Sequence, residues 1–292
     1  MRGLIVKNQN GYFSIFNDEN QFKLCRSRGK LKRSTDIRVG DVVEYEMQRD
    51  SEPVIVRVLP RKTLLERPSV ANVDQMIIVS AVRSPDLNLY TLDKMILLAE
   101  DAGIENIVIC INKAELDPAG AARAVSVYNN AGYPSLAVSV YEKTGLSALS
   151  AMLTGHVTAF SGPSGVGKSS LLNHFLGREV FISGDISRKT GRGKNTTRHA
   201  ELIPFTDHSF LMDTPGYTSL ALESVVNTNL SVLFREFLPY LDHCRFNDCL
   251  HLKEPDCAVR KAAEEGRIAA SRYQSYCAAL QEVREASGKR LK

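Results

Sequence analysis

The stretch Gly162–Ser169, with the sequence GPSGVGKS, decides the fold of this chain, and the apolar run Val157–Phe160 precedes it. The glycines at positions 162, 165 and 167 allow the backbone to turn tightly and to aim successive N–H groups at a polyphosphate. The complete eight-residue pattern lies between an expected strand and an expected helix, which is the setting that a phosphate-binding loop requires. The alternative is an accidental glycine-rich turn, and this setting argues against it.

Two side chains of this loop have expected roles. Lys168 would reach the β and γ phosphates, and the Ser169 hydroxyl would ligate Mg²⁺. The loop alone does not identify the nucleotide, because kinases and transport ATPases carry nearly the same pattern. The residues expected to hold the nucleotide here are Gly162, Pro163, Ser164, Gly165, Val166, Gly167, Lys168, Ser169 and Ser170.

The composition is that of an ordinary globular protein. The 292 residues are enough for two or three domains, and 43% of them are hydrophobic and 24% charged. No apolar run is long enough to cross a bilayer, and residues 1–3 do not open a signal-peptide pattern. We therefore expect a cytoplasmic monomer with no membrane partner.

Residues 1–66 alternate apolar and polar side chains in short runs, for example Tyr12–Phe16, Val42–Glu46 and Val54–Val58. This spacing predicts a small barrel of about five strands of the oligonucleotide-binding (OB) type, although a Tudor-like or SH3-like barrel would show similar runs. The segment Gln21–Gly40 is basic, and such loops commonly contact nucleic acid in OB barrels; a solvated surface loop is the alternative. Its basic residues are Lys23, Arg26, Arg28, Lys30, Lys32, Arg33 and Arg38.

After Pro68 the pattern changes to near-continuous apolar runs alternating with helices. Buried parallel strands joined by crossover helices explain this pattern, so we expect a doubly wound α/β domain. Helices are expected over Asn88–Ala102 and Ala119–Ala131. The expected strands are Gln75–Val82, Asn106–Ile111, Ser135–Val140, Val157–Phe160 and Ser209–Met212.

The tetrapeptide Asn112-Lys113-Ala114-Glu115 follows one expected strand, at the carboxyl edge where ligands bind in open α/β sheets. It resembles the guanine-recognition motif Asn-Lys-x-Asp of GTPases. The carboxylate would accept hydrogen bonds from the ring N–H and the amine of guanine, while Asn112 and Lys113 would shape the base pocket. Glu115 is one methylene longer than the usual aspartate. A lone tetrapeptide can also occur there by chance.

Two further segments read as GTPase switches. Asp213-Thr214-Pro215-Gly216 follows the last expected strand, so Asp213 would hold Mg²⁺ and the Gly216 N–H would sense the γ-phosphate. The polar segment 184–199 has the character of a first switch, in which Thr197, or failing that Thr196, would close on Mg²⁺. The expected magnesium ligands are Ser169, Thr197 and Asp213, and a plain turn and a surface loop are the alternatives.

Near the C-terminus, four side chains have metal-ligand spacing. Cys244, Cys249, His251 and Cys257 form the pattern Cys-x₄-Cys-x-His-x₅-Cys. Three thiolates and one imidazole complete a tetrahedral shell with no open position, which is typical of structural zinc. The alternatives are three buried cysteines with an incidental histidine, or His243 as the fourth ligand.

The order of the motifs narrows the interpretation. The guanine motif at 112 precedes the phosphate loop at 162, which is a circular permutation of the usual GTPase order. A permuted GTPase with a barrel before it and a cysteine cluster behind it resembles the ribosome small subunit-dependent GTPase A family. The segments that carry this resemblance are NKAE at 112, GPSGVGKSS at 162, GRGKNTTRHAEL at 191, DTPGYTSL at 213 and the cluster at 244.

The resemblance implies three domains: an RNA-binding OB barrel over residues 1–66, a circularly permuted GTPase over 67–220 and a helical zinc-binding domain over 221–292. It also implies slow hydrolysis of GTP to GDP, stimulated by the small (30S) ribosomal subunit during its late maturation, with contacts to ribosomal RNA. The family places a histidine before the switch threonines, whereas this chain has Asn195, so either hydrolysis needs no such base or His199 substitutes. Tyr217 matches the family's hydrophobic residue after DTPG.

Two other functions remain open on the sequence. One is a nucleotide kinase or transport ATPase, which would leave DTPG and NKAE without a role. The other is a nucleotide-stabilised RNA-binding scaffold with negligible turnover.

Overall fold

The computed structural model describes most of the chain, in two compact units. The described residues are 1–9, 11–28, 36–49, 51–66, 68–180, 200–206, 208–214, 222, 225 and 229–290, without the side chains of 287–290. The first unit comprises Met1–Ile77, Ile104–Asn106 and Leu146–Thr218, and the second comprises Ile78–Gly103, Ile107–Gly145 and Ser219–Lys292. None of the described helices combines the length and the hydropathy that a bilayer span needs.

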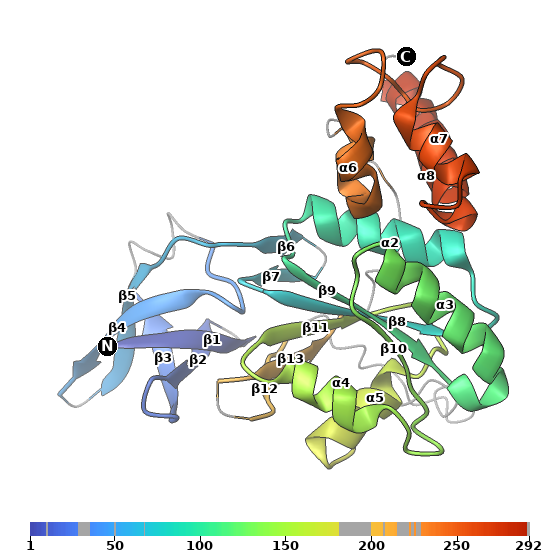
Figure 1. Ribbon diagram of the computed structural model, residues 1–292. Coiled ribbons are helices and arrows are strands. Elements are labelled where there is room, and N and C mark those ends of the chain that lie inside the picture. The colour runs from blue at the N-terminus through green and yellow to red at the C-terminus, as the bar shows by residue number, and fades with distance from the viewer. Residues whose placement is uncertain are drawn as a thin grey trace. The chain divides into compact units, whose positions relative to one another are not determined.

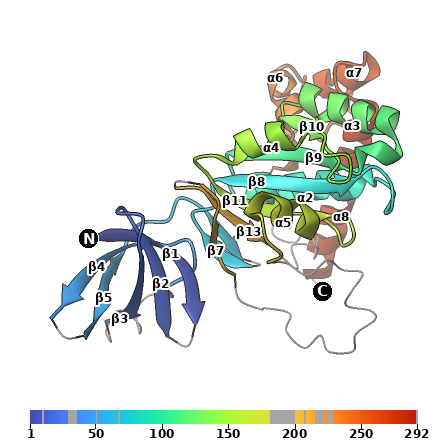
Figure 2. The same cartoon turned by 90° about the horizontal axis from the view of Figure 1, so that it is seen from below.

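The N-terminal strands close a barrel in the order β1-β2-β3-β5-β4 (Figure 2). Strands β3 and β5 pair in parallel and the other neighbours pair antiparallel. Alternate side chains, such as Ile5, Ile15 and Ile55, are fully buried in its interior. The expected five-stranded OB-type barrel is therefore confirmed. Its strands are β1 (Arg2–Gln9), β2 (Tyr12–Asn17), β3 (Phe22–Ser27), β4 (Val42–Gln48) and β5 (Ser51–Val58).

Strand β1 also contacts the segment that leads into the last part of the first unit. The backbone N–H of Leu202 donates to the Val6 carbonyl at 2.9 Å. The Lys7 ammonium contacts the Glu201 carboxylate oxygens at 3.0 and 2.8 Å. A short hairpin of β6 (Leu64–Glu66) and β7 (Ser69–Ala71) follows the barrel.

Six strands form the central sheet, in the order β10-β9-β8-β11-β13-β12. Strands β9 and β10 pair in parallel, as do β11 and β13, whereas β12 runs antiparallel to β13. The expected doubly wound strands are all present, but β10 ends three residues earlier than expected because the chain turns after Ala137. The strands are β8 (Gln75–Ala81), β9 (Asn106–Asn112), β10 (Ser135–Ala137), β11 (Val157–Ser161), β12 (Ile203–Pro204) and β13 (Phe210–Asp213).

Each of the two expected crossover helices starts directly after a residue whose side chain caps its first turn. The Asn88 side chain accepts from the Thr91 N–H at 2.9 Å, and the Asp117 side chain accepts from the Gly120 N–H at 2.8 Å. Pro118 suits the first turn of its helix, because its missing N–H has no partner there in any case. The helices along this region are α2 (Leu89–Asp101), η1 (Ala114–Leu116), α3 (Pro118–Asn130), α4 (Leu146–Leu153) and α5 (Lys168–Leu176).

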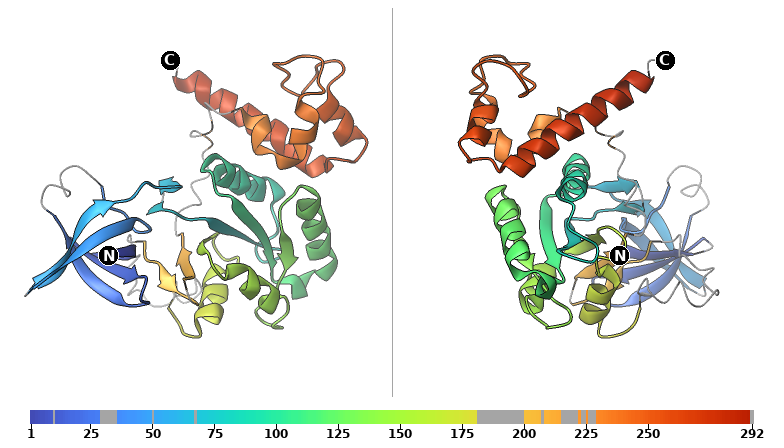
Figure 3. Two further views of the ribbon diagram at one scale, coloured as in Figure 1. Left: turned by 60° about the vertical axis from the view of Figure 1, so that its left-hand side comes forward. Right: turned by 90° about the vertical axis from the view of Figure 1, so that its right-hand side faces the viewer.

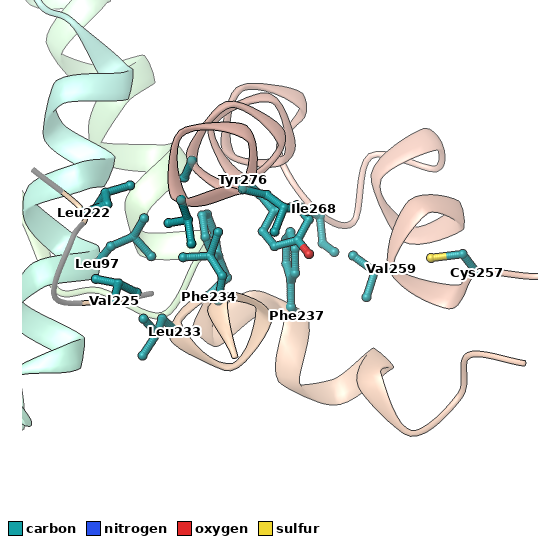
Figure 4. Close-up of a cluster of buried hydrophobic side chains, with 14 of the residues drawn as sticks. Leu97, Leu222, Val225, Leu233, Phe234, Phe237, Cys257, Val259, Ile268 and Tyr276 are labelled. Carbon is teal, nitrogen blue, oxygen red and sulfur yellow. The ribbon is translucent and has the colours of Figure 1, made fainter. Parts of the chain in front are cut away.

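The C-terminal segment folds as short helical turns against one long helix (Figures 1 and 3). Figure 4 shows Phe234, Phe237 and Tyr276 converging with Leu97 of α2, and these side chains belong to one buried cluster. The C-terminal helices and α2 thus share a hydrophobic core within the second unit. The elements are η3 (Leu230–Leu233), η4 (Arg235–Phe237), α6 (Leu238–Leu241), α7 (Ala258–Glu264) and α8 (Ala270–Arg290).

A buried arginine lies beside this core. The guanidinium of Arg272 on α8 donates to Asp93 of α2 and to Glu236 of η4, both at 2.6 Å. The side chains of Arg272 and Asp93 are each only 1% exposed. The charge of Arg272 is therefore compensated entirely by side chains from two other elements.

Candidate nucleotide-binding site

The phosphate loop joins the end of β11 to the start of α5. Gly162, Gly165 and Gly167 have φ values of 152°, 81° and 96°, a region that side chains with a Cβ rarely adopt. The Lys168 ammonium donates to the carbonyls of Gly162 and Pro163 at 2.6 and 3.0 Å. The loop therefore curls around its own lysine at the amino end of a helix, where phosphate groups bind favourably.

Strand β13 brings Asp213 beside this loop. Strands β11 and β13 pair in parallel with Phe160 opposite Asp213, and the Thr214 N–H and hydroxyl both donate to the Phe160 carbonyl, at 3.1 and 2.9 Å. Asp213 Oδ1 is buried and has no hydrogen-bond partner among the described residues. A carboxylate oxygen with unused acceptor capacity suits a divalent cation.

Burial shifts the pKa of both Lys168 and Asp213. It lowers the pKa of Lys168, against the opposing effect of the negative charge of Asp213. It raises the pKa of Asp213, against the opposing effects of Lys168 and of the Thr214 N–H. A bound polyphosphate would favour the charged lysine, and Mg²⁺ would favour the charged aspartate, so a nucleotide with its metal fits both groups.

The guanine motif lies in the second unit, at the carboxyl end of β9. Lys113 adopts a left-handed conformation with φ of 57°, and its ammonium donates to the Ser84 carbonyl. Asn112 is 3% exposed. Glu115 Oε2 is buried and has no hydrogen-bond partner among the described residues. An orphaned carboxylate oxygen at this position suits the paired N–H donors of a guanine ring.

A neighbouring turn was not expected from the sequence. The Ala114 N–H donates to the Val138 carbonyl at 3.0 Å, so the segment after β10 lies beside the guanine motif. Ser139 is fully buried, and its hydroxyl accepts from the Glu142 N–H at 2.9 Å. A Cβ on Gly145 would lie 2.4 Å from the Ala137 carbonyl oxygen, so this turn needs glycine. Because this segment follows a parallel strand of the expected sheet, its position could have predicted that it lies at the ligand-binding edge.

Three sequence expectations lie outside the described residues. They are the first switch, with Thr196 and Thr197; the Gly216 N–H; and the residues Asn195 and Tyr217. The basic residues Lys30, Lys32 and Arg33 of the barrel loop also lie outside.

The four expected zinc ligands converge. Their ligand atoms all lie within 4.8 Å of one another. His251 Nδ1 is 3.5 Å from both Cys244 Sγ and Cys257 Sγ, and these two sulfurs are 3.9 Å apart. A tetrahedral ion with Zn–S bonds of about 2.3 Å requires ligand separations of roughly 3.5–3.8 Å, so the donor set fits zinc.

The surroundings of the cluster orient its ligands. The Tyr273 hydroxyl donates to the His251 carbonyl at 2.7 Å, and the Arg260 N–H donates to Cys257 Sγ at 3.4 Å. The Glu254 carboxylate accepts from three backbone N–H groups of the same loop, those of residues 250, 252 and 253. Such outer contacts hold metal ligands in place.

Family models match two parts of the chain. A model described as the RsgA N-terminal domain matches residues 2–55, and one described as the RsgA GTPase matches residues 58–223. The chain belongs to the RsgA GTPase family. This membership confirms the resemblance drawn from the motifs, and with it the expectation of a GTP-hydrolysing enzyme.

Relatives extend this similarity over the full length of the chain. A small ribosomal subunit biogenesis GTPase RsgA from Caldanaerobacter subterraneus subsp. tengcongensis is 40% identical, with 100% of this chain and 99% of the relative covered. One from Clostridium botulinum is 37% identical over 97% of both chains.

Two solved structures share the fold. YjeQ from Thermotoga maritima aligns with a TM-score of 0.82 at 35% identity, covering 98% of each chain. YloQ, described as a circularly permuted GTPase, aligns with a TM-score of 0.83 at 29% identity, covering 97% of this chain and 95% of the other. The expected circular permutation is thus confirmed.

Proposed function

We propose that this chain binds GTP and hydrolyses it to GDP and phosphate during late assembly of the small ribosomal subunit, whose RNA it contacts. The subunit stimulates the reaction, and the protein acts as a monomer in the cytoplasm. The names of the full-length relatives support the ribosomal role. The observation that carries the hydrolytic role is the phosphate loop folded around Lys168, with the buried Oδ1 of Asp213, which has no partner among the described residues, on the neighbouring strand.

In this proposal each segment has one task. The backbone N–H groups of residues 162–170 bind the α and β phosphates, and Lys168 neutralises charge that develops on the transferred phosphoryl group. Asp213, Ser169 and Thr197 would hold Mg²⁺, and the Gly216 N–H would contact the γ-phosphate. Residues Asn112, Lys113, Ala114 and Glu115 bind guanine. Magnesium, when bound, supplies electrostatic stabilisation of the phosphate charge.

We also propose that Cys244, Cys249, His251 and Cys257 bind one structural zinc ion. Three thiolates and one imidazole would fill all four positions of a tetrahedral ion and leave none open for a substrate. The domain boundaries at 66/67 and 220/221 remain part of this proposal.

Turnover measurements test the hydrolytic role. GTP hydrolysis is measured with and without isolated small subunits for the wild type and for Lys168→Ala, with the exposed Lys62→Ala as the matched control. We expect stimulation by subunits in the wild type and in Lys62→Ala. In Lys168→Ala we expect roughly a 100- to 1000-fold lower rate, because a group that stabilises transition-state charge is removed.

The same assay separates the competing functions. Negligible hydrolysis with subunits present would favour the RNA-binding scaffold, and displacement of bound GDP by ATP as well as by GTP would favour a kinase or ATPase. Asn195→His tests whether the family's histidine adds to the rate: an unchanged rate would mean that hydrolysis needs no such base.

A further inference from the structure

A pocket of about 280 Å³ lies in the first unit, between the barrel and the residues on either side of the expected first switch. Ser14 and Phe22 line it from strands β2 and β3, and Lys7 from β1. Arg178 and Val180 line it from the chain just before residue 181, and Glu201 from the chain just after residue 199. Three barrel strands and the described residues on either side of the expected switch therefore share a single pocket.

The lining of the pocket combines an apolar floor with an exposed aromatic ring and an exposed arginine. Its floor is apolar, with Val6 and Leu202 only 3% and 2% exposed, and the Phe22 ring at its wall is 56% exposed. An exposed aromatic ring on the strand 2–3 face of an OB barrel can stack on an unpaired base. Arg178 is exposed and lies on the lining, where it can meet a phosphate.

The size of the pocket limits its occupant. A volume of about 280 Å³ lies just below the roughly 300–1,000 Å³ that drug-sized ligand sites enclose. That space suits one base and excludes a helix or a folded peptide segment. The Lys7–Glu201 pair at 2.8 Å leaves Glu201 neutralised, so its carboxylate does not repel a phosphate.

We propose that this pocket binds a single unpaired nucleotide of RNA, with its base stacked on Phe22 and its phosphate near Arg178. The proposal rests on the proposed ribosomal function and deepens it. The bound nucleotide would contact both ends of the expected switch at once. The N–H of Val180, which also lines the pocket, donates to Asn173 Oδ1 of helix α5 at 2.9 Å. RNA bound here would thereby influence the hydrolytic machinery that begins at Lys168.

A fluorescence experiment tests the binding directly. The chain contains no tryptophan, so Phe22→Trp introduces a single reporter that can still stack. Leu24→Trp is the matched control, because Leu24 lies on the same strand with similar exposure, 50%, and does not line the pocket. Titration with a single-stranded oligoadenylate should quench Phe22→Trp several times more strongly than Leu24→Trp. Equal quenching of the two variants would overturn the proposal. Quenching by intact subunits but not by their extracted RNA would also overturn it, because the pocket would then bind a ribosomal protein.

A second measurement links the pocket to turnover. Phe22→Ala should bind small subunits roughly tenfold more weakly, as expected when a base loses an aromatic partner. Its subunit-stimulated GTPase rate should fall at fixed subunit concentration while its unstimulated rate stays unchanged, and Leu24→Ala should resemble the wild type. If the wild type is stimulated and both alanine variants match it, the pocket proposal fails alone. If the wild type itself is not stimulated, the proposed function fails. The oligoadenylate titration then still tests whether the pocket binds RNA.

Discussion

The cysteine cluster and the nucleotide site differ in how much of each site the protein completes by itself. At the cluster, four ligands within fourteen residues of sequence converge to within 4.8 Å. The phosphate loop and the guanine motif, which our proposal assigns to one nucleotide, belong to different compact units. Both halves keep buried carboxylate oxygens that have no partner among the described residues, on Asp213 and Glu115. In our proposal the cluster is therefore a structural centre whose protein ligands fill every position, whereas the nucleotide site is completed only when its ligand binds.

Removal of the metal should have the largest effect. Stripping zinc with a chelator, or replacing Cys249 with serine, should cost roughly 5 kcal/mol or more of unfolding free energy, because metal binding supplies folding energy to such segments. Zinc content and thermal unfolding are the measurements. Cys277→Ser is the matched control, since this thiol is partly buried and lies outside the cluster. A Cys249→Ser protein that keeps one zinc per chain and its full stability would contradict the assignment.

Replacing the buried Arg272 should have the second-largest effect on stability. Arg272→Met leaves Asp93 and Glu236 without their counter-charge, and breaking a buried pair in this way costs about 3–5 kcal/mol. Arg284→Met, at an exposed position on the same helix, should cost little. Chemical denaturation of the two variants measures the difference. Combining Arg272→Met with Asp93→Leu and Glu236→Met should recover much of the loss, and equal stability of both single variants would refute the argument.

The guanine motif should show a smaller effect, confined to ligand binding. Glu115→Ala should weaken GDP binding by about 10- to 100-fold, because donors of the purine lose a buried acceptor worth about 1–3 kcal/mol. Glu142→Ala removes an exposed carboxylate of the same unit and serves as the control. Calorimetric titration with GDP and ADP measures affinity and selectivity together. Unchanged discrimination between the two nucleotides would remove Glu115 from the site.

The smallest effect concerns Glu282 of α8. Burial opposes its ionisation, but hydrogen bonds from Lys94 and Tyr90 and the charge of Lys94 outweigh burial, and the Leu222 N–H adds a further bond, so its pKa is lowered from 4.5. A carboxyl group with a lowered folded pKa adds stability above pH 4.5, and this stability is lost as pH falls through the folded value.

Glu282→Gln should therefore destabilise the protein at pH 7 by at most about 1 kcal/mol, since the group is partly exposed. The difference from the wild type should vanish in thermal unfolding at acidic pH, below the folded pKa. A constant difference across the pH range would mean that packing, and not charge, is responsible.

The elements that carry local signals could be predicted from the sequence. The phosphate loop, the guanine motif and the zinc ligands are each short in sequence, and the permuted order of two of them identified the family. Strands such as β8 and β9 were predictable because buried parallel strands are continuously apolar. The expected helices Asn88–Ala102 and Ala119–Ala131 agree within one residue at each end with the observed bounds, Leu89–Asp101 and Pro118–Asn130.

The features that depend on distant partners could not be predicted. Arg272 lies 179 residues from Asp93 in sequence, and an arginine in an otherwise polar helix reads as a solvated surface residue. The pocket around Phe22 draws on three barrel strands and on residues 178, 180 and 201–204, so no local pattern marks it. The early end of β10 depends on the turn at Gly145, whose fit against the Ala137 carbonyl is a tertiary contact.

The contacts of strands β1 and β2 with Leu202 and Phe210 also limit where this chain can be truncated. The Val6 carbonyl accepts from Leu202, and the Phe16 ring packs edge-on against Phe210 at 5.2 Å between centroids. A shortened chain lacking residues 1–58 would expose the edge strand β12 and the Phe210 ring to solvent. Exposed edge strands pair with other chains, so such a truncation should aggregate rather than yield an isolated enzyme domain.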